Sequence, residues 1–256
     1  MSDLPWVLLR GLTREQRHWG VFAMDFAAAF PNAPVITLDL PGNGSLNGQR
    51  SLTQVGAMAA YCRGELHTRG LAPPYRVLAM SLGAMVTTAW CAMHPHEIDS
   101  AVLINTSMRP FSPAHHRFRP RALLRLALTW PDAVARERAI LAVTSNATQL
   151  DVALAKRWAA YRRERPVSAA NALRQLWAAA RFVAPATPPH TRVLVLTSTH
   201  DMLVDTRCSL ALAWAWQCSI ESHPWAGHDL PLDDAAWVIE RVRRFCSLSP
   251  LGRGLG

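Results

Sequence analysis

The stretch that decides the fold is Leu78-Ala79-Met80-Ser81-Leu82-Gly83-Ala84. A short apolar β-type run leads into it, and an apolar helical pattern leaves it. A serine at such a junction is typical of a nucleophile elbow, whose strained backbone tolerates only small side chains two residues before and two after the serine. Ala79 and Gly83 meet that demand. The sequence therefore predicts that Ser81 is a nucleophile.

Short apolar strands alternate with helices on both sides of this stretch. The expected strands are Trp6–Leu9, Pro34–Leu38, Arg76–Met80, Ala101–Ile104, Arg192–Thr197 and Cys218–Ser222. Helices are expected after Thr13 as N-cap, over Leu52–Arg69, Leu82–Met93 and Asp205–Trp216, and from Asp233 to Phe245. This alternation predicts an α/β fold, a mainly parallel sheet covered by helices on both faces.

The alternation stops after Asn105 and resumes near His190. Between these points only helical stretches are expected, namely Arg121–Thr129, Ala133–Val143, Leu150–Arg163 and Ala169–Phe182. We therefore expect a core formed by residues 1–106 and 190–246, with a helical cap inserted at 107–189. The tail 247–256 is rich in glycine and serine and is expected to be disordered.

Composition sets the broad class. The chain has 256 residues, half of them apolar, which suits one domain with a large buried core. No apolar run approaches the roughly 18 residues of a membrane helix, and Met1-Ser2-Asp3 lacks the basic start of a secretory signal, so we expect a cytoplasmic protein without a membrane span. The five cysteines are scattered and odd in number, which favours reduced thiols over disulfides or a zinc site.

The net charge of +9 is concentrated in the expected cap. Fourteen of the 27 basic residues lie between Ser107 and His190, against four of the 18 acidic residues. A charge confined in this way favours a solvated basic face over nucleic-acid binding. Two functional alternatives stay open: the substrate is presented by an acidic acyl carrier protein, or the substrate is itself an anion.

A nucleophilic serine needs a histidine base, and the histidine needs a carboxylate that fixes its tautomer. Because the carboxyl ends of parallel strands meet at one edge of the sheet, candidates should directly follow strands. Asp201 follows the strand that begins at Arg192, and His228 follows the last strand. The chain order Ser81, Asp201, His228 is the α/β-hydrolase order. The competing residues are Asp205 and Asp99 for the acid, and His223 and His200 for the base.

Further motifs carry a resemblance that spans Trp6–Phe245. Arg10-Gly11-Leu12 followed by Trp19 looks like an H-G-x…W oxyanion loop, residues 39–44 (DLPGNG) are similar to a D-x-P-G-x-G turn, and Gly227 precedes His228 as in a terminal G-H. Together with the elbow, these motifs resemble the α/β-hydrolase superfamily. The nearest likeness is to serine esterases and thioesterases with a helical cap, of the pimeloyl-carrier-protein methyl ester esterase type.

The resemblance implies roles for further residues. The backbone N–H groups of Leu12 and Leu82 would form the oxyanion hole. Arg10 stands where the family usually has histidine, so a permanent cation beside the hole is available to recognise an acidic group on the substrate. Arg10 and Trp19 are therefore candidate substrate-binding residues.

The predicted function is hydrolysis of a small carboxylic ester or thioester through an acyl-enzyme on Ser81. No cofactor or metal is expected, because the chain lacks G-x-x-x-x-G-K-[ST] and H-E-x-x-H motifs. The alternatives are a carrier-protein-linked thioesterase or acyltransferase that uses the basic cap, and a non-catalytic binding protein with the same fold.

Overall fold

A computed structural model describes residues 4–122, 132–148 and 151–248. Its centre is a six-stranded sheet in the order β2-β1-β3-β4-β5-β6, and every neighbouring pair is parallel. The strands are β1 (Trp6–Leu9), β2 (Val35–Leu38), β3 (Tyr75–Met80), β4 (Ile98–Ile104), β5 (Arg192–Ser198) and β6 (Ser219–His223). The predicted α/β fold with a parallel sheet is confirmed.

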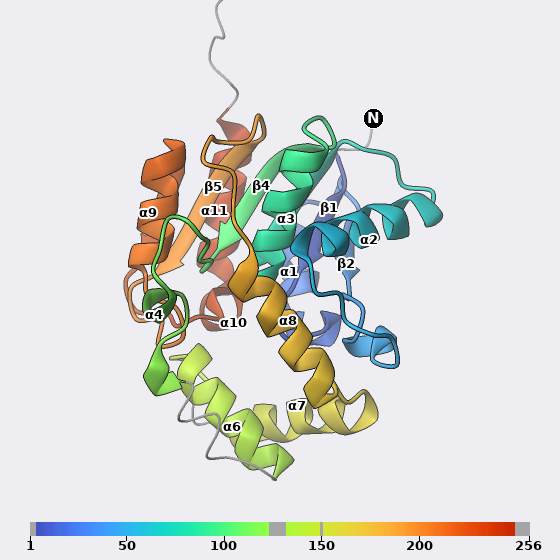
Figure 1. Ribbon diagram of the computed structural model, residues 1–256, viewed down its shortest axis with the longest axis vertical. Coiled ribbons are helices and arrows are strands. Elements are labelled where there is room, and N and C mark those ends of the chain that lie inside the picture. Colours follow the sequence, from blue (N-terminus) through green and yellow to red (C-terminus); the bar gives the residue numbers. More distant parts are fainter. Residues whose placement is uncertain (1–3, 123–131, 149–150, 249–256) are drawn as a thin grey trace, which may run out of the picture.

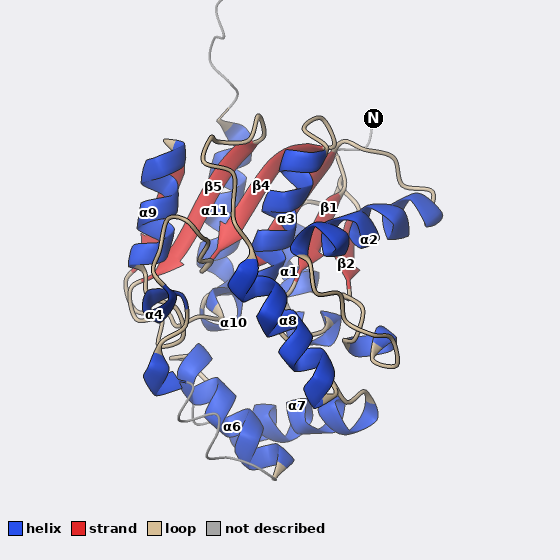
Figure 2. Cartoon of the chain, viewed as in Figure 1, coloured by secondary structure: helices blue, strands red, loops and turns tan. Residues whose placement is uncertain are grey.

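Helices cover both faces of the sheet (Figure 2). They are α1 (Phe22–Ala29), α2 (Val55–Thr68), α3 (Leu82–Met93), α9 (Arg207–Trp216), α10 (Leu230–Asp233) and α11 (Ala235–Ser247). Side chains alternate along each strand, so that Val7 and Leu9 pack with α2, α3 and α9, whereas Trp6 and Leu8 pack with α1 and α11. The two buried clusters fix the sheet between its helical layers.

Four further helices lie in the chain between β4 and β5: α4 (Ala114–Arg117), α6 (Ala133–Thr144), α7 (Val152–Glu164) and α8 (Ala169–Arg181). Figure 1 shows α6 and α7 beyond the end of the sheet, with α8 running back toward α3. We call these four helices the cap. Most of the expected helix Arg121–Thr129, the first residue of Leu150–Arg163 and residues 249–256 of the tail lie outside the described residues.

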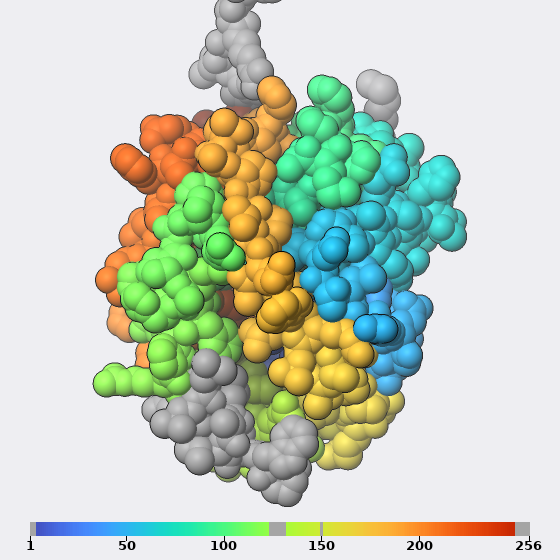
Figure 3. Space-filling view, in the orientation of Figure 1, coloured from blue at the N-terminus to red at the C-terminus, as the bar shows by residue number. Residues whose placement is uncertain are grey.

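Helix α8 joins the cap to the core through buried amides, and Figure 3 shows it on the molecular surface beside the loop after β2. Gln175 Nε2 donates to Asn43 Oδ1 (2.7 Å), and its Oε1 accepts the backbone N–H of Thr13 (2.9 Å). The Asn171 side chain accepts the N–H of Ser51 and donates to a carbonyl of the same loop. Because unpaired buried amides are costly, these bonds fix where α8 lies.

The N-terminal helix does not begin as predicted. Thr13 is not an N-cap: its φ is 57°, and its N–H is held by Gln175. The chain instead forms a short 3-10 turn, η1 (Gln16–Trp19), before α1 begins at Phe22. A second 3-10 turn, η2 (Gly44–Leu46), follows β2.

The predicted last helix, Asp233 to Phe245, corresponds to α11 but begins two residues later, and Asp233 instead ends the short helix α10. The side chain of Asp233 accepts N–H groups from Gly227 (2.7 Å) and Asn146 (2.9 Å), which ties it to the loop before His228. Asp234 then caps α11 by accepting the N–H of Trp237. The other boundaries shift by a few residues at most, as is usual for helix and strand ends.

Candidate active site

Ser81 lies in the turn between β3 and α3, at φ 50° and ψ −115°. This backbone conformation is strained for a residue with a side chain and presents Ser81 at the carboxyl end of the sheet. A Cβ on Gly83 would lie 2.7 Å from the carbonyl oxygens of Leu9 and Arg10. Only glycine therefore fits two residues after Ser81. The elbow pattern in the sequence predicts a small residue at this position.

Asp201 and His228 lie side by side, buried, although 27 residues separate them in sequence. His228 Nδ1 is 2.7 Å from Asp201 Oδ2, and Asp201 Oδ1 accepts the N–H groups of Leu203 and Val204. These backbone bonds hold the carboxylate in place. Because a carboxylate accepts the hydrogen bond, the neutral imidazole carries its proton on Nδ1 and leaves Nε2 as a base.

The competing acids and histidines have other partners. Asp205 is paired with Arg207 and Arg119, and Asp99 with Arg76. The largest effect on Asp205 is the hydrogen bond from Arg207, which lowers its pKa well below the usual range. His223 faces Asp234 (3.2 Å), and the exposed His200 contacts the Thr199 hydroxyl.

Asn105, directly after β4, was not foreseen as part of the site. It is fully enclosed and has a φ of 46°. Its Nδ2 donates to the carbonyl oxygen of His228 (2.8 Å), and its Oδ1 accepts the N–H of Ser198 (2.9 Å). Asn105 thus ties the loop that carries His228 to the end of β5, just before Asp201. The available signal was its position, a polar residue at a strand's carboxyl end.

The proposed oxyanion loop lies against the elbow. A Cβ on Gly11 would be 3.1 Å from the Ser81 Cβ, which shows how closely the loop after β1 approaches the serine. In the described part of the chain, no hydrogen bond uses the backbone N–H of Leu12 or of Leu82. Both residues line the same cavity as Ser81. Two N–H groups are therefore available to a ligand there.

Arg10 and Trp19 behave differently from expectation. The Arg10 guanidinium donates to both carboxylate oxygens of Asp229 (3.0 and 2.5 Å) and lies 4.7 Å from the centre of the Trp19 ring. Arg10 reaches the cavity wall, but its charge is compensated. Trp19 is not among the cavity-lining residues. It is buried beside Phe22, and Arg10, which does line the cavity, lies over its ring.

A cavity of about 500 Å³ opens beside Ser81 and His228, between the sheet edge and the cap. The core contributes Leu12, Leu82 and Met85, and the cap contributes mainly apolar residues such as Ile140 and Leu176. This volume falls within the usual range for pockets that bind small molecules. The site is therefore a mainly apolar chamber with a serine and a histidine on its wall.

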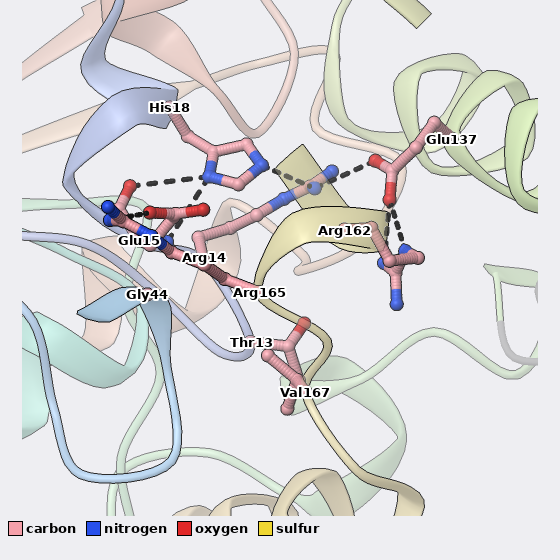
Figure 4. A pocket seen from close by; sticks show the side chains of 9 residues that line it. All are labelled: Thr13, Arg14, Glu15, His18, Gly44, Glu137, Arg162, Arg165 and Val167. Carbon is pink, nitrogen blue, oxygen red and sulfur yellow. Dashed lines mark hydrogen bonds and ion pairs between the residues drawn. The ribbon is translucent and has the colours of Figure 1, made fainter. Parts of the chain in front are cut away.

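A buried ionic cluster joins the cap to the oxyanion loop. Figure 4 shows the Glu137 carboxylate between the guanidinium groups of Arg14 and Arg162. The closest contacts are 2.8 Å to Arg14 Nη1 and 2.6 Å to Arg162 Nη2. Arg14 also stacks on Trp158 of α7. Burial, and then the positive charge of Arg14, lower the pKa of the neighbouring His18 well below its usual value.

Asp39 has a structural role in the turn after β2. Its carboxylate accepts the backbone N–H groups of Gln16 (2.7 Å) and Ser45 (3.2 Å), which closes the turn after β2. Burial raises the pKa of Asp39. Within the described residues, no cluster of acidic, histidine or cysteine side chains could hold a metal ion. No helix among them is long and apolar enough to cross a membrane.

The sequence matches the alpha/beta hydrolase family over residues 6–241. The chain belongs to this family and is an enzyme of the hydrolase class. A search of curated proteins finds no match.

Solved structures share the fold at low sequence identity. The enol-lactonase from Burkholderia xenovorans LB400 is 19% identical at a TM-score of 0.78, over 96% of this chain and 92% of that one. A candidate non-heme bromoperoxidase, BpoC, from Mycobacterium tuberculosis H37Rv is 22% identical at 0.77, over 96% and 92%. A thermophilic esterase from Thermogutta terrifontis is 19% identical at 0.74, over 96% and 90%. At these identities the likeness concerns the fold alone.

Proposed function

We propose that the protein is a serine hydrolase of carboxylic esters or thioesters, with Ser81, His228 and Asp201 as its catalytic residues. The observation that carries this proposal is the 2.7 Å contact of His228 Nδ1 with Asp201, beside a cavity that His228 shares with the strained Ser81. The chain order of the three residues agrees with the family.

The reaction follows from these positions. Ser81 Oγ attacks the carbonyl carbon while His228 Nε2 takes its proton, and Asp201 stabilises the imidazolium. The N–H groups of Leu12 and Leu82 hold the negative oxygen of the tetrahedral intermediate. The leaving alcohol or thiol takes the proton from His228, and water then releases the acyl group by the same steps. General-base catalysis contributes about 10²- to 10⁴-fold in rate, and one oxyanion donor about 10²- to 10³-fold.

A fluorophosphonate probe tests the proposal, because it labels only an activated serine. We expect stoichiometric labelling of the wild type and none of Ser81→Ala, with Ser107→Ala as a control for another serine of the cavity wall. Absence of Ser81-dependent labelling in folded protein would refute the hydrolase and leave the non-catalytic binding protein as the better description.

The exposed part of the basic cap favours a second candidate, a thioesterase or acyltransferase whose substrate is presented by an acidic acyl carrier protein. Lys156, Arg157 and Arg163 are exposed on α7, whereas Arg162 is turned toward Glu137. In this case Arg157→Glu with Arg163→Glu should weaken turnover of a carrier-linked acyl group and spare a small thioester. Equal loss on both substrates would count against a carrier.

A further inference from the structure

The wall of the active-site cavity carries more positive than negative charge. The arginines that line it are Arg10, Arg14, Arg117, Arg136 and Arg162. Among described residues, three carboxylates contact lining side chains: Asp201, Asp229 and Glu137. Asp201 is engaged by His228, and Asp229 by Arg10. Of these three carboxylates, only Glu137 therefore pairs with the arginines Arg14 and Arg162 of the cavity wall.

Glu137 serves two arginines at once. Arg14 contacts one of its oxygens, and Arg162 contacts the other through both Nε (2.7 Å) and Nη2 (2.6 Å). The Glu137 side chain is fully enclosed, whereas that of Arg162 retains 19% exposure and reaches the cavity. Two guanidinium groups share one carboxylate, so a positive charge remains at this end of the chamber.

A further arginine, Arg117, adds to that potential. Arg117 donates to the carbonyl oxygens of Ala179 (2.6 Å) and Ala180 (3.2 Å), which are neutral groups and leave its charge in place. Arg136 lines the cavity close to Arg162. Burial, and then the neighbouring Arg162, lower the pKa of Arg136. The cap side of the cavity is thus a positive region inside a mostly apolar wall.

Positive charge in an apolar cavity is costly unless an anion compensates it. We infer that the cavity binds esters or thioesters that carry a carboxylate or phosphate group, with that anion beside Arg162 and Arg14 and the scissile carbonyl at Ser81. This inference rests on the proposed hydrolase and specifies its substrate class. Arg10 is not the anion-binding residue, because Asp229 already occupies both of its terminal nitrogens.

Matched pairs of esters test the inference. Mono-p-nitrophenyl adipate is compared with p-nitrophenyl hexanoate, which places the carboxylate on the acyl side. The pair p-acetoxybenzoate and phenyl acetate places it on the alcohol side. After division by the uncatalysed rates, we expect kcat/KM to favour the anionic member of at least one pair by about 10- to 100-fold, the value of one hydrogen bond between charged groups. Equal kcat/KM within both pairs would overturn the inference and leave the hydrolase intact.

Arg162 and Arg163 form a matched pair for mutation, since they are consecutive on α7 but only Arg162 lines the cavity. In Arg162→Gln the preference should fall about tenfold or more, and in Arg163→Gln it should persist. An unchanged preference in Arg162→Gln would contradict the assignment.

One measurement does not depend on any variant. Adipate should inhibit wild-type hydrolysis of p-nitrophenyl hexanoate competitively, and far better than hexane-1,6-diol does. Equal inhibition would also count against an anion site. Loss of all Ser81-dependent turnover, with neutral and anionic esters alike, would refute the hydrolase proposal and the inference together.

Discussion

Replacing Glu137 with glutamine should destabilise the protein strongly, although the shape of the side chain is kept. The substitution removes the one carboxylate between Arg14 and Arg162 and leaves both guanidinium groups without that partner. Arg14 belongs to the oxyanion loop and Arg162 to α7. The loss should therefore weaken the attachment of the cap as well as the global fold.

The size of the effect follows from burial. The side chains of Glu137 and Arg14 are 0% and 10% exposed, so water cannot replace the lost charge. Removing one member of a buried pair costs about 3–5 kcal/mol, and the partial exposure of Arg162 places this case near 3 kcal/mol. At about 2–4 °C per kcal/mol for a chain of this size, the melting temperature should fall by roughly 10 °C.

Glu164 supplies the matched control. It also pairs with an arginine, Arg17 at 2.5 Å, but its side chain is 61% exposed. Glu164→Gln should therefore cost at most about 1 kcal/mol. Thermal and urea unfolding, followed by circular dichroism, measure both variants. A loss below about 1 kcal/mol in Glu137→Gln, equal to that of the control, would refute the reasoning that the buried cluster fastens the cap.

Four further predictions concern the acid dependence of Glu137, the serine turn, Asp201 and a buried thiol. Burial raises the pKa of Glu137, but Arg14 and then Arg162 outweigh it and hold the pKa below its usual value. The stabilisation by ionised Glu137 is thus fully present above the unfolded-state pKa of about 4.3 and is lost as the pH falls through the folded pKa. The difference in free energy of unfolding between the wild type and Glu137→Gln should therefore shrink on acidification. A difference that does not depend on pH would contradict this role of the Glu137 charge. Gly83→Ala should reduce kcat about 100-fold or more, because its Cβ would press on two carbonyl oxygens next to the oxyanion loop; near-normal kcat would show that the elbow has spare room. Asp201→Asn should lower kcat roughly 10³- to 10⁴-fold with little change in KM, since an amide cannot hold the same imidazole tautomer; a change confined to KM would contradict that role. Burial raises the pKa of the Cys62 thiol to about 12, so iodoacetamide at about pH 8 should modify Cys62 far more slowly in native than in urea-unfolded protein, as peptide mass spectrometry would detect.

The parts of the fold that sequence predicted well are those governed by local pattern. The helix Leu82–Met93 matches α3 at both ends, because the strained serine turn begins it and its apolar residues continue without interruption. The positions of Asp201 and His228 could likewise be inferred, since residues after parallel strands gather at one edge.

Contacts between distant segments decided what the sequence could not show. Threonine is a common N-cap residue, but the side chain of Gln175, 162 residues later, accepts the N–H of Thr13. The chain therefore forms a 3-10 turn after Thr13 and not the predicted helix. Glu137 looked like one of the few acids in a basic segment. Only the packing of α6 against α7 and the oxyanion loop makes it the counter-ion of Arg14 and Arg162.

Arg10 shows how a departure from the family pattern can change the meaning of a site. Taken alone, an arginine beside the oxyanion loop suggests a substrate-binding cation. In the structure its guanidinium closes on Asp229, the residue after the proposed base, and its flat face covers Trp19. The pair therefore connects the loop that carries Leu12 to the loop that carries His228, across 219 residues of sequence. Because a bidentate pair fixes orientation as well as distance, Arg10 can position the loop of Leu12 relative to the loop of His228. On the proposed assignment, the charge available to a substrate then comes from the contact between the cap and the loop after β1, where Arg162 and Arg14 share the carboxylate of Glu137.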